Sequence, residues 1–216
     1  MHYDMSRATP RESYNLLIGL VAPRPIAFVT SHDKHGLLNA APFSAYNYLG
    51  TDPPVVAIGI ADRAGSPMGK DTARNIRETG EFVINVVNED IAQAMNLCAI
   101  DFPPEVNELE ISGLETTPSQ IVKVPRIAQA PAALECREIS TTAIGRTRIV
   151  LAQVLSIYVR DEFMNLEKGY VLAEELHAIG RMNGLGNYVK TRDAFLRIPR
   201  LSYSEWLEEN PENDKT

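Results

Sequence analysis

Short runs of apolar, largely β-branched residues recur along the chain, with residues typical of turns between them. Runs of strand length cover 26–30, 37–44, 55–60, 82–87, 133–143 and 148–159. The run 82–87 has almost no polar relief, so we expect it to lie inside a sheet with both faces covered. Turn residues at 33–36 separate the first two runs, and two consecutive prolines stop the chain before the third.

Helical patterns are fewer. Residues 10–20 combine an early proline with a one-sided apolar pattern, which predicts a helix. Asp71 has the character of a helix start, and that helix is expected to end near Gly80. A further helix is predicted over 89–98. The segment 101–131 is rich in Pro and Glu, and we expect it to wander over the surface.

The order of these elements favours one fold class. Strands dominate, hairpin-type connections outnumber helical crossovers, and the chain has no internal repeat. This pattern favours a Greek-key antiparallel β-barrel with a few peripheral helices over a doubly wound parallel sheet. We expect one mainly β domain over 1–205 and a polar C-terminal tail, expected to fray, over 206–216.

Composition narrows the functional classes. A net charge of -7 over 216 residues argues against a protein that grips nucleic acid, although it leaves room for a local basic pocket. The two cysteines, Cys98 and Cys136, form no C-x-x-C unit, so a disulfide scaffold or a four-ligand zinc site is not expected. No apolar run approaches the ~20 residues of a membrane span. We therefore expect a reduced, cytoplasmic protein with no membrane partner.

Common catalytic motifs are missing from the sequence. It has no G-x-S-x-G elbow and no H-E-x-x-H. The glycines at 184 and 186 lack the third glycine of a dinucleotide fingerprint and follow no strong strand. His32 and His35 sit in a turn and are more simply explained as a solvated loop than as metal ligands. With no nucleophile and base in view, the chemistry is expected to belong to a cofactor.

Three stretches suit a phosphorylated aromatic cofactor, and each has a plainer alternative. Residues 39–47 have small side chains that would let a flat ring approach the backbone, and Asn39 and Ser44 could bond the polar edge of that ring. The plainer alternative is a strand end with a proline kink. Residues 63–72 place two cations and glycines before a helix start, which suits a phosphate, or form a capped surface helix. Residues 181–188 combine a cation, glycines and an aromatic ring, or form a simple loop.

The order of these motifs resembles that of a known family. In sequence they are PRPIAFVTS, NAAPFSAYN, DPPVVAIGI, KDTARNI, GEFVINV and a late GR followed by GNY. Together they resemble the flavin reductase-like family of FMN-binding split β-barrels, in the branch of flavoredoxins and of the reductase components of two-component monooxygenases. The resemblance covers roughly residues 10–200. It implies FMN bound at a homodimer interface.

The resemblance also implies site residues. Thr30 and Ser31 would end the first strand beside the flavin ring. Lys70 would hold the phosphate with Arg63 and Thr72, while Asp71 orders the loop. The remaining contacts implied are Asn39, Ala41, Pro42, Phe43 and Ser44 along the isoalloxazine, Arg24 as a brace, and Tyr188 approaching from its own or the partner chain.

One stretch departs from the family pattern. Many members carry a Gly-Asp-His step near the nicotinamide, whereas residues 145–148 read Gly-Arg-Thr-Arg. Arg146 or Arg148 could meet a nucleotide phosphate instead, or both could simply end a solvated strand. The leading hypothesis is an enzyme that passes a hydride from NAD(P)H to FMN, with a monooxygenase or another electron acceptor as partner. The alternatives are an FMN-carrying electron-transfer protein without a nicotinamide site, and a flavin-free binding module.

Overall fold

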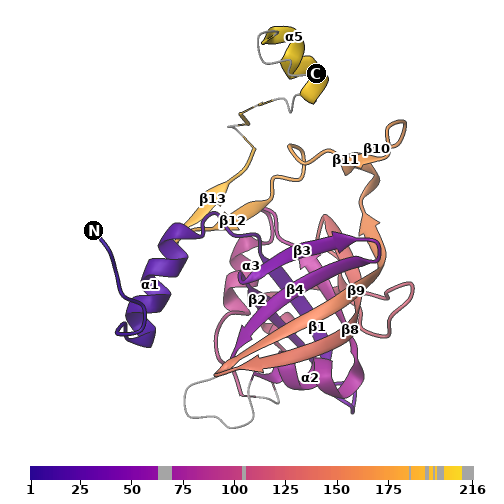
Figure 1. Ribbon diagram of the computed structural model, residues 1–216. Coiled ribbons are helices and arrows are strands. Elements are labelled where there is room, and N and C mark those ends of the chain that lie inside the picture. Colours follow the sequence, from indigo (N-terminus) through magenta and orange to yellow (C-terminus); the bar gives the residue numbers. More distant parts are fainter. Residues whose placement is uncertain are drawn as a thin grey trace.

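A computed structural model describes residues 1–62, 70–103, 106–184, 186–192, 195–196, 198 and 202–210 (Figure 1). Seven strands form its main sheet: β1 (Ala27–His32), β2 (Leu38–Phe43), β3 (Tyr46–Thr51), β4 (Pro54–Ala61), β5 (Glu81–Val86), β8 (Ala132–Ile144) and β9 (Thr147–Val159). Three small two-stranded ladders pair β6 (Thr116–Thr117) with β7 (Arg126–Ile127), β10 (Met164–Asn165) with β11 (Tyr170–Val171), and β12 (Ile179–Arg181) with β13 (Tyr188–Lys190). The helices are α1 (Pro10–Leu20), α2 (Asp71–Thr79), α3 (Ala92–Leu97), α4 (Glu108–Ser112), α5 (Tyr203–Glu209) and a 3-10 turn at Asp161–Phe163.

The main sheet is antiparallel throughout and has the order β2-β1-β5-β8-β9-β4-β3. Its two edge strands, β2 and β3, follow each other in the chain and are separated only by Ser44 and Ala45. The sheet must therefore curl until its edges meet, and the edges stay unpaired. At this point the Gly59 N–H donates to the Ala45 carbonyl at 2.6 Å, which ties β4 to the crossing. The fold is a split β-barrel, as the sequence predicted.

The interior of the barrel is apolar. Strand alternation directs Ala27 and Val29 of β1 inward, where they meet Ile58, Phe82 and other fully buried side chains. Ile76 of α2 joins the same cluster, and the partly buried Ala73 packs against it, so this helix closes against the barrel through apolar side chains. The prediction that 82–87 lies inside the sheet is confirmed, since β5 lies between β1 and β8.

The opposite face of β1 and β2 packs under a second layer. Phe28 and Ala40 point outward into a cluster built by α3, α4 and the segment that follows them. Leu109, Ile127 and Ala130 are almost completely buried there. The expectation that 101–131 wanders over the surface was therefore wrong: its scattered apolar residues are anchors, too widely spaced to show a helix or strand period.

Buried polar groups fix this outer segment to the sheet. Asn85 donates to the Phe28 carbonyl at 3.0 Å and accepts from the Ile127 N–H at 2.8 Å. The Thr30 hydroxyl donates to the Pro125 carbonyl at 2.8 Å. Glu135 is 2% exposed and accepts three backbone N–H bonds from residues 120–122. These bonds hold the segment, which has little regular secondary structure, because buried side chains pair its backbone N–H and carbonyl groups.

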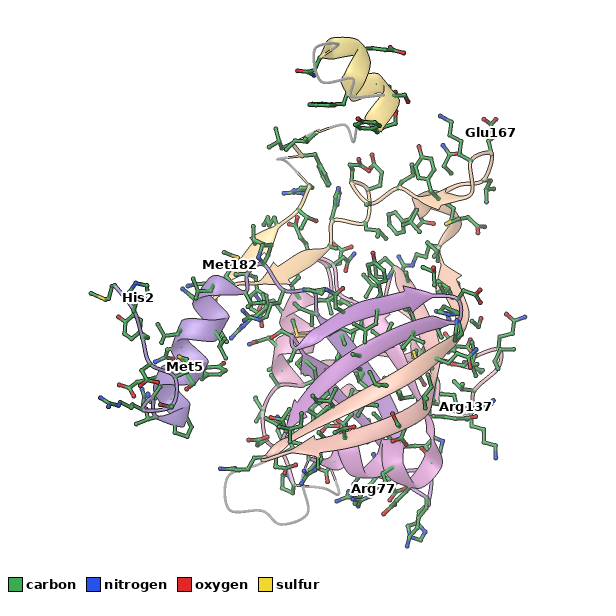
Figure 2. All side chains as sticks on the ribbon, in the orientation of Figure 1. His2, Met5, Arg77, Arg137, Glu167 and Met182 are labelled. Carbon is green, nitrogen blue, oxygen red and sulfur yellow. The ribbon has the colours of Figure 1, made fainter. Side chains whose placement is uncertain are left out.

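Both ends of the chain extend away from the barrel. Helix α1 has a capping box between Thr9 and Glu12 but no buried residue. The β10–β11 hairpin carries Glu167 outward, and α5 lies beyond it, far from the barrel (Figures 1 and 2). Helix α5 also runs across the expected start of the polar tail at 206. In the described ranges, no helix is both long and apolar enough to cross a membrane.

Candidate functional site

The start of α2 lies against the β1–β2 hairpin and joins three polar residues predicted from the sequence. The Asn39 amide donates to the Thr72 hydroxyl at 3.1 Å. Ser31 lies directly opposite Asn39 across the hairpin, and its hydroxyl accepts from the amide of Asn75 at 3.2 Å. These contacts connect residues more than 30 positions apart, and they set the helix start beside the strand ends.

The N-terminus of α2 has no side-chain cap. Lys70 is the N-cap residue, with extended backbone and no capping hydrogen bond from its side chain. Its ammonium lies 5.8 Å from the centre of the Phe43 ring and 4.0 Å from Asp101, and its side chain is 33% exposed. Asp71 forms an ion pair with Arg74 at 2.7 Å. The backbone N–H groups of a helix start and the lysine together favour an anion here.

Arg24 occupies the other end of β2. It is 8% exposed and donates to the carbonyls of Ile18, Val21 and Met182 at 2.5–2.8 Å. It also approaches the Ser44 hydroxyl at 3.4 Å. Figure 2 shows Met182 beside the end of α1, so this single guanidinium links α1, the β12 strand and the end of β2. Its interactions are with neutral groups, so its positive charge is not neutralised by these contacts.

Strand alternation separates two residues that the sequence grouped. Ser31 shares a face with Ala27 and Val29, toward α2, whereas Thr30 faces the outer layer and is 0% exposed. Thr72 is also buried, at 1% exposed. Ala41 and Pro42 of β2, and Ser44 just after it, are half-buried and keep accessible surface. Of the thirteen candidate residues, only Arg63 lies outside the described residues.

A pocket opens between the β1–β2 turn and α2, with a volume of about 380 Å³. Asn39 and Asp71 line it, together with Asp33, Arg74 and Asn75, which the sequence reasoning did not select. Asn75 is 2% exposed, and its side-chain amide oxygen has no partner among the described residues. Asn75 and Arg74 stand inside the quoted motif KDTARNI, so the signal was present but not assigned to either residue.

Residues 145–148, which depart from the family pattern, lie at the β8–β9 hairpin turn. Arg148 forms an ion pair with Asp62 at 2.7 Å. Arg146 is exposed and donates to the Asp62 carbonyl at 3.3 Å. The Asp62 carboxylate therefore forms a short ion pair with Arg148, whereas Arg146 makes a longer hydrogen bond to the Asp62 backbone carbonyl.

Two aromatic residues complete the surroundings. Tyr188 is half-buried against the outer cluster, with the Arg181 guanidinium 4.6 Å from its ring centre. Tyr46 begins β3, and burial together with the nearby Cys136 thiol raises its pKa to about 12. Its phenol therefore stays protonated at neutral pH and supplies no base there.

A family model described as the flavin reductase-like domain matches residues 20–174 of the chain. The chain belongs to the flavin reductase-like family. The match spans the whole barrel, from the end of α1 past the β10–β11 hairpin. Membership makes the protein a flavin-related oxidoreductase.

Similar proteins match the sequence or structure of this flavin reductase-like protein over nearly its full length. A protein of Deinococcus radiodurans is 44% identical over 214 residues, which covers 96% of this chain and 93% of that protein. The solved structure of 2-nitrobenzoate 2-nitroreductase NbaA from Pseudomonas fluorescens is 38% identical, with a TM-score of 0.85 over 94% of this chain and 98% of that one. Nitrilotriacetate monooxygenase component B from Bacillus cereus is 32% identical, with a TM-score of 0.84 over 91% and 98%.

Proposed function

We propose that this protein binds FMN along β2 and the start of α2, and that it transfers a hydride from NAD(P)H to that flavin. The observation that carries the proposal is the polar strip formed by Asn39, Lys70 and Arg24 beside one strand of a flavin reductase-like barrel. The names of the two similar structures, a nitroreductase and a monooxygenase component, describe redox proteins, which supports the same class of function.

The residues at the start of α2 suit the phosphate of FMN. The N-terminus of a helix offers backbone N–H groups and positive potential, and Lys70 adds a full positive charge. The Thr72 hydroxyl accepts from Asn39 and so keeps its own proton to donate. Because Thr72 is buried, we assign the direct phosphate contacts to Lys70 and the backbone, with Thr72 fixing Asn39 in place.

The residues of β2 suit the flavin ring. Ala41 and Pro42 are small and half-buried, so a flat ring can approach the backbone there. Ser44 and Arg24 close the far end of the strip. The side-chain amide oxygen of Asn75 has no donor among the described residues, and the ribityl chain of FMN carries hydroxyl donors. The donor set therefore fits FMN at both its polar ends.

Bound FMN would supply the redox chemistry, since the isoalloxazine accepts a hydride directly. The protein's own side chains hold and orient the reactants. In the proposed complex, Asn39, Ser44 and backbone N–H groups would stabilise the negative charge that develops on the reduced ring, as preorganised donors do. No side-chain acid is needed for the hydride step.

For the nucleotide, the geometry favours Arg146 over Arg148. Arg148 is already held by the carboxylate of Asp62, so recruiting it would cost an ion pair. Arg146 is exposed, and its guanidinium donates to the backbone carbonyl of Asp62 at 3.3 Å, with no carboxylate partner among the described residues. We therefore assign any phosphate contact at this turn to Arg146.

We also propose a homodimer. A barrel that is split open leaves strand edges and apolar surface that a second copy can cover. Exposed apolar residues on α1, β3 and α5 include Leu20, Leu49 and Tyr203. Obligate homodimers bury roughly 1,000–2,500 Å² on each partner. Sedimentation equilibrium should give the dimer mass, and a monomer with FMN fully bound would contradict this.

The function is tested by anaerobic stopped-flow spectroscopy of the FMN-loaded protein with NADH and with NADPH. We expect flavin absorbance to bleach, and Arg146→Ala to slow bleaching at low nucleotide concentration, while the exposed Arg77→Ala serves as a matched control. Flavin that stays oxidised with both nucleotides, yet is reduced by dithionite, would indicate an electron-transfer protein. Protein that binds no flavin would indicate a binding module.

A further inference from the structure

A second pocket lies where the outer segment crosses β8 and β9. It has a volume of about 250 Å³ and shares no lining residue with the pocket between the β1–β2 turn and α2. The strands contribute Glu135 and residues 156–158 to its lining, and the outer segment contributes residues 118–120 and Arg126. None of these residues belongs to the proposed flavin contacts, so the proposed function does not account for this pocket.

Arg126 is the one cation among the described lining residues. Its guanidinium carbon lies 3.6 Å from the centre of the Tyr158 ring, so the ring covers one side of the guanidinium. The side chain is half-buried, yet within the described ranges it forms no ion pair and donates no hydrogen bond. The N–H donors of an arginine lie along the edge of its plane, and stacking on a ring leaves them available.

The backbone of Arg126 is fixed on both sides. The carbonyl of Pro125 accepts from the Thr30 hydroxyl at 2.8 Å, and the N–H of Ile127 donates to Asn85 at 2.8 Å. The guanidinium is therefore held by the ring at its tip and by the sheet at its base. A donor that is ordered before binding loses little conformational entropy when a ligand arrives.

The rest of the lining is mixed. Ile157 is 61% exposed and offers an apolar wall. The Ser119 hydroxyl donates to the Val124 carbonyl and keeps its oxygen as an acceptor, and Ser156 adds a second hydroxyl. The Glu135 carboxylate accepts three backbone N–H groups and forms no ion pair with Arg126. The arginine therefore has no anionic partner within the pocket.

We propose that this pocket binds a small carboxylate with an apolar body, and that Arg126 pairs with the carboxylate. Two parallel N–H groups of a guanidinium match the two oxygens of a carboxylate. A phosphate dianion fits less well, because the lining offers one cation and also contains the negative Glu135. The apolar body of the ligand packs on Ile157. The volume corresponds to about eight liquid waters, which limits that body to about one ring.

Isothermal titration calorimetry with benzoate tests this, on the protein alone and on the protein saturated with FMN. Benzamide has the same shape without the charge, and acetate has the charge without the ring. We expect benzoate to bind at least tenfold more tightly than either, with or without FMN. Arg126→Gln and Ile157→Glu should each weaken benzoate at least tenfold. Ile139→Glu, at an exposed position of β8 outside the pocket, is the matched control and should stay within twofold of wild type.

Benzoate that fails to bind up to about 10 mM overturns the inference. Benzamide or acetate binding as tightly as benzoate does so too, and so does displacement of benzoate by FMN. Because position 157 is exposed and the variant leaves the stacked pair in place, Ile157→Glu decides the matter if Arg126→Gln does not fold. An affinity unchanged in Ile157→Glu refutes the assignment to this pocket. Protein that binds benzoate as expected but no FMN would keep this inference and remove the proposed function.

Discussion

Removing the carboxylate of Glu135 should destabilise the protein without changing how it binds a flavin. The side chain is 2% exposed, and its oxygens accept the N–H groups of Gln120 at 2.8 Å, Ile121 at 2.6 Å and Val122 at 3.0 Å. These bonds hold the segment that in turn bonds Thr30. Glu135 lies on β8 and lines none of the proposed flavin site.

The magnitude follows from the three bonds. A hydrogen bond to a charged group contributes about 1.5–3 kcal/mol, which would give at least ~4.5 kcal/mol if all three donors stayed dry. Gln120 and Ile121 are exposed and can regain water after the segment moves, whereas Val122 is 5% exposed. We therefore expect Glu135→Ala to lower the free energy of unfolding by about 3 kcal/mol. Glu135→Gln retains one acceptor oxygen and should cost about 1–2 kcal/mol.

Urea denaturation measures both variants against wild type, with the exposed Glu115→Ala as a control for loss of one negative charge. With a slope of about 2 kcal/mol per molar urea, the alanine variant should shift the midpoint by more than about 1 M. FMN affinity should stay within twofold of wild type. An alanine variant as stable as the control would refute the assignment, and a tenfold loss of FMN affinity would show that this segment belongs to the site.

Three further predictions concern the site and the pH dependence. Lys70→Ala should weaken FMN about 10- to 150-fold and riboflavin much less, with the exposed Lys168→Ala as control; equal weakening in titrations would place the phosphate elsewhere. Burial raises the pKa of both Cys98 and Cys136, so mass spectrometry should find neither thiol alkylated by iodoacetamide at pH 8 in native protein; rapid labelling would contradict this. A hydrogen bond from Lys190 lowers the pKa of Glu89, so its contribution to stability is present above about pH 4.5 and lost as pH falls further; Glu89→Gln should flatten that acid slope.

The sequence predicted most of the fold because the strands are long and apolar. The boundaries expected for 133–143 and 148–159 agree within a residue or two with β8 and β9. Strand β3 was not predicted, because Tyr46–Thr51 mixes polar residues with glycine and shows no clear apolar run. An edge strand can have this composition because it is less buried than a central strand. The anchors within 101–131 show no period, so only their contacts in the fold identify them.

The candidate site was predictable as a set of motifs but not as a geometry. Sequence places Asn39 and Thr72 in separate motifs, and their bond exists because the hairpin returns to the helix start. It also grouped Thr30 with Ser31, which alternation along β1 sends to opposite faces. Asn75 escaped notice because an asparagine inside a helix has no ligand-like pattern of its own; its unpartnered oxygen is a property of the fold.

Because of this alternation, the two faces of β1 and β2 make different contacts. On one face, Ser31 and Asn39 contact α2, beside the proposed ligand site; on the other, Thr30 and Ala40 are held by the outer segment, where the buried Glu108 accepts the Ala40 N–H at 3.1 Å. Adjacent residues of one strand therefore contact the candidate site on one face and the outer segment on the other. Because a rigid backbone transmits position along the strand, the anchors beyond the site fix where Asn39 stands without touching a ligand.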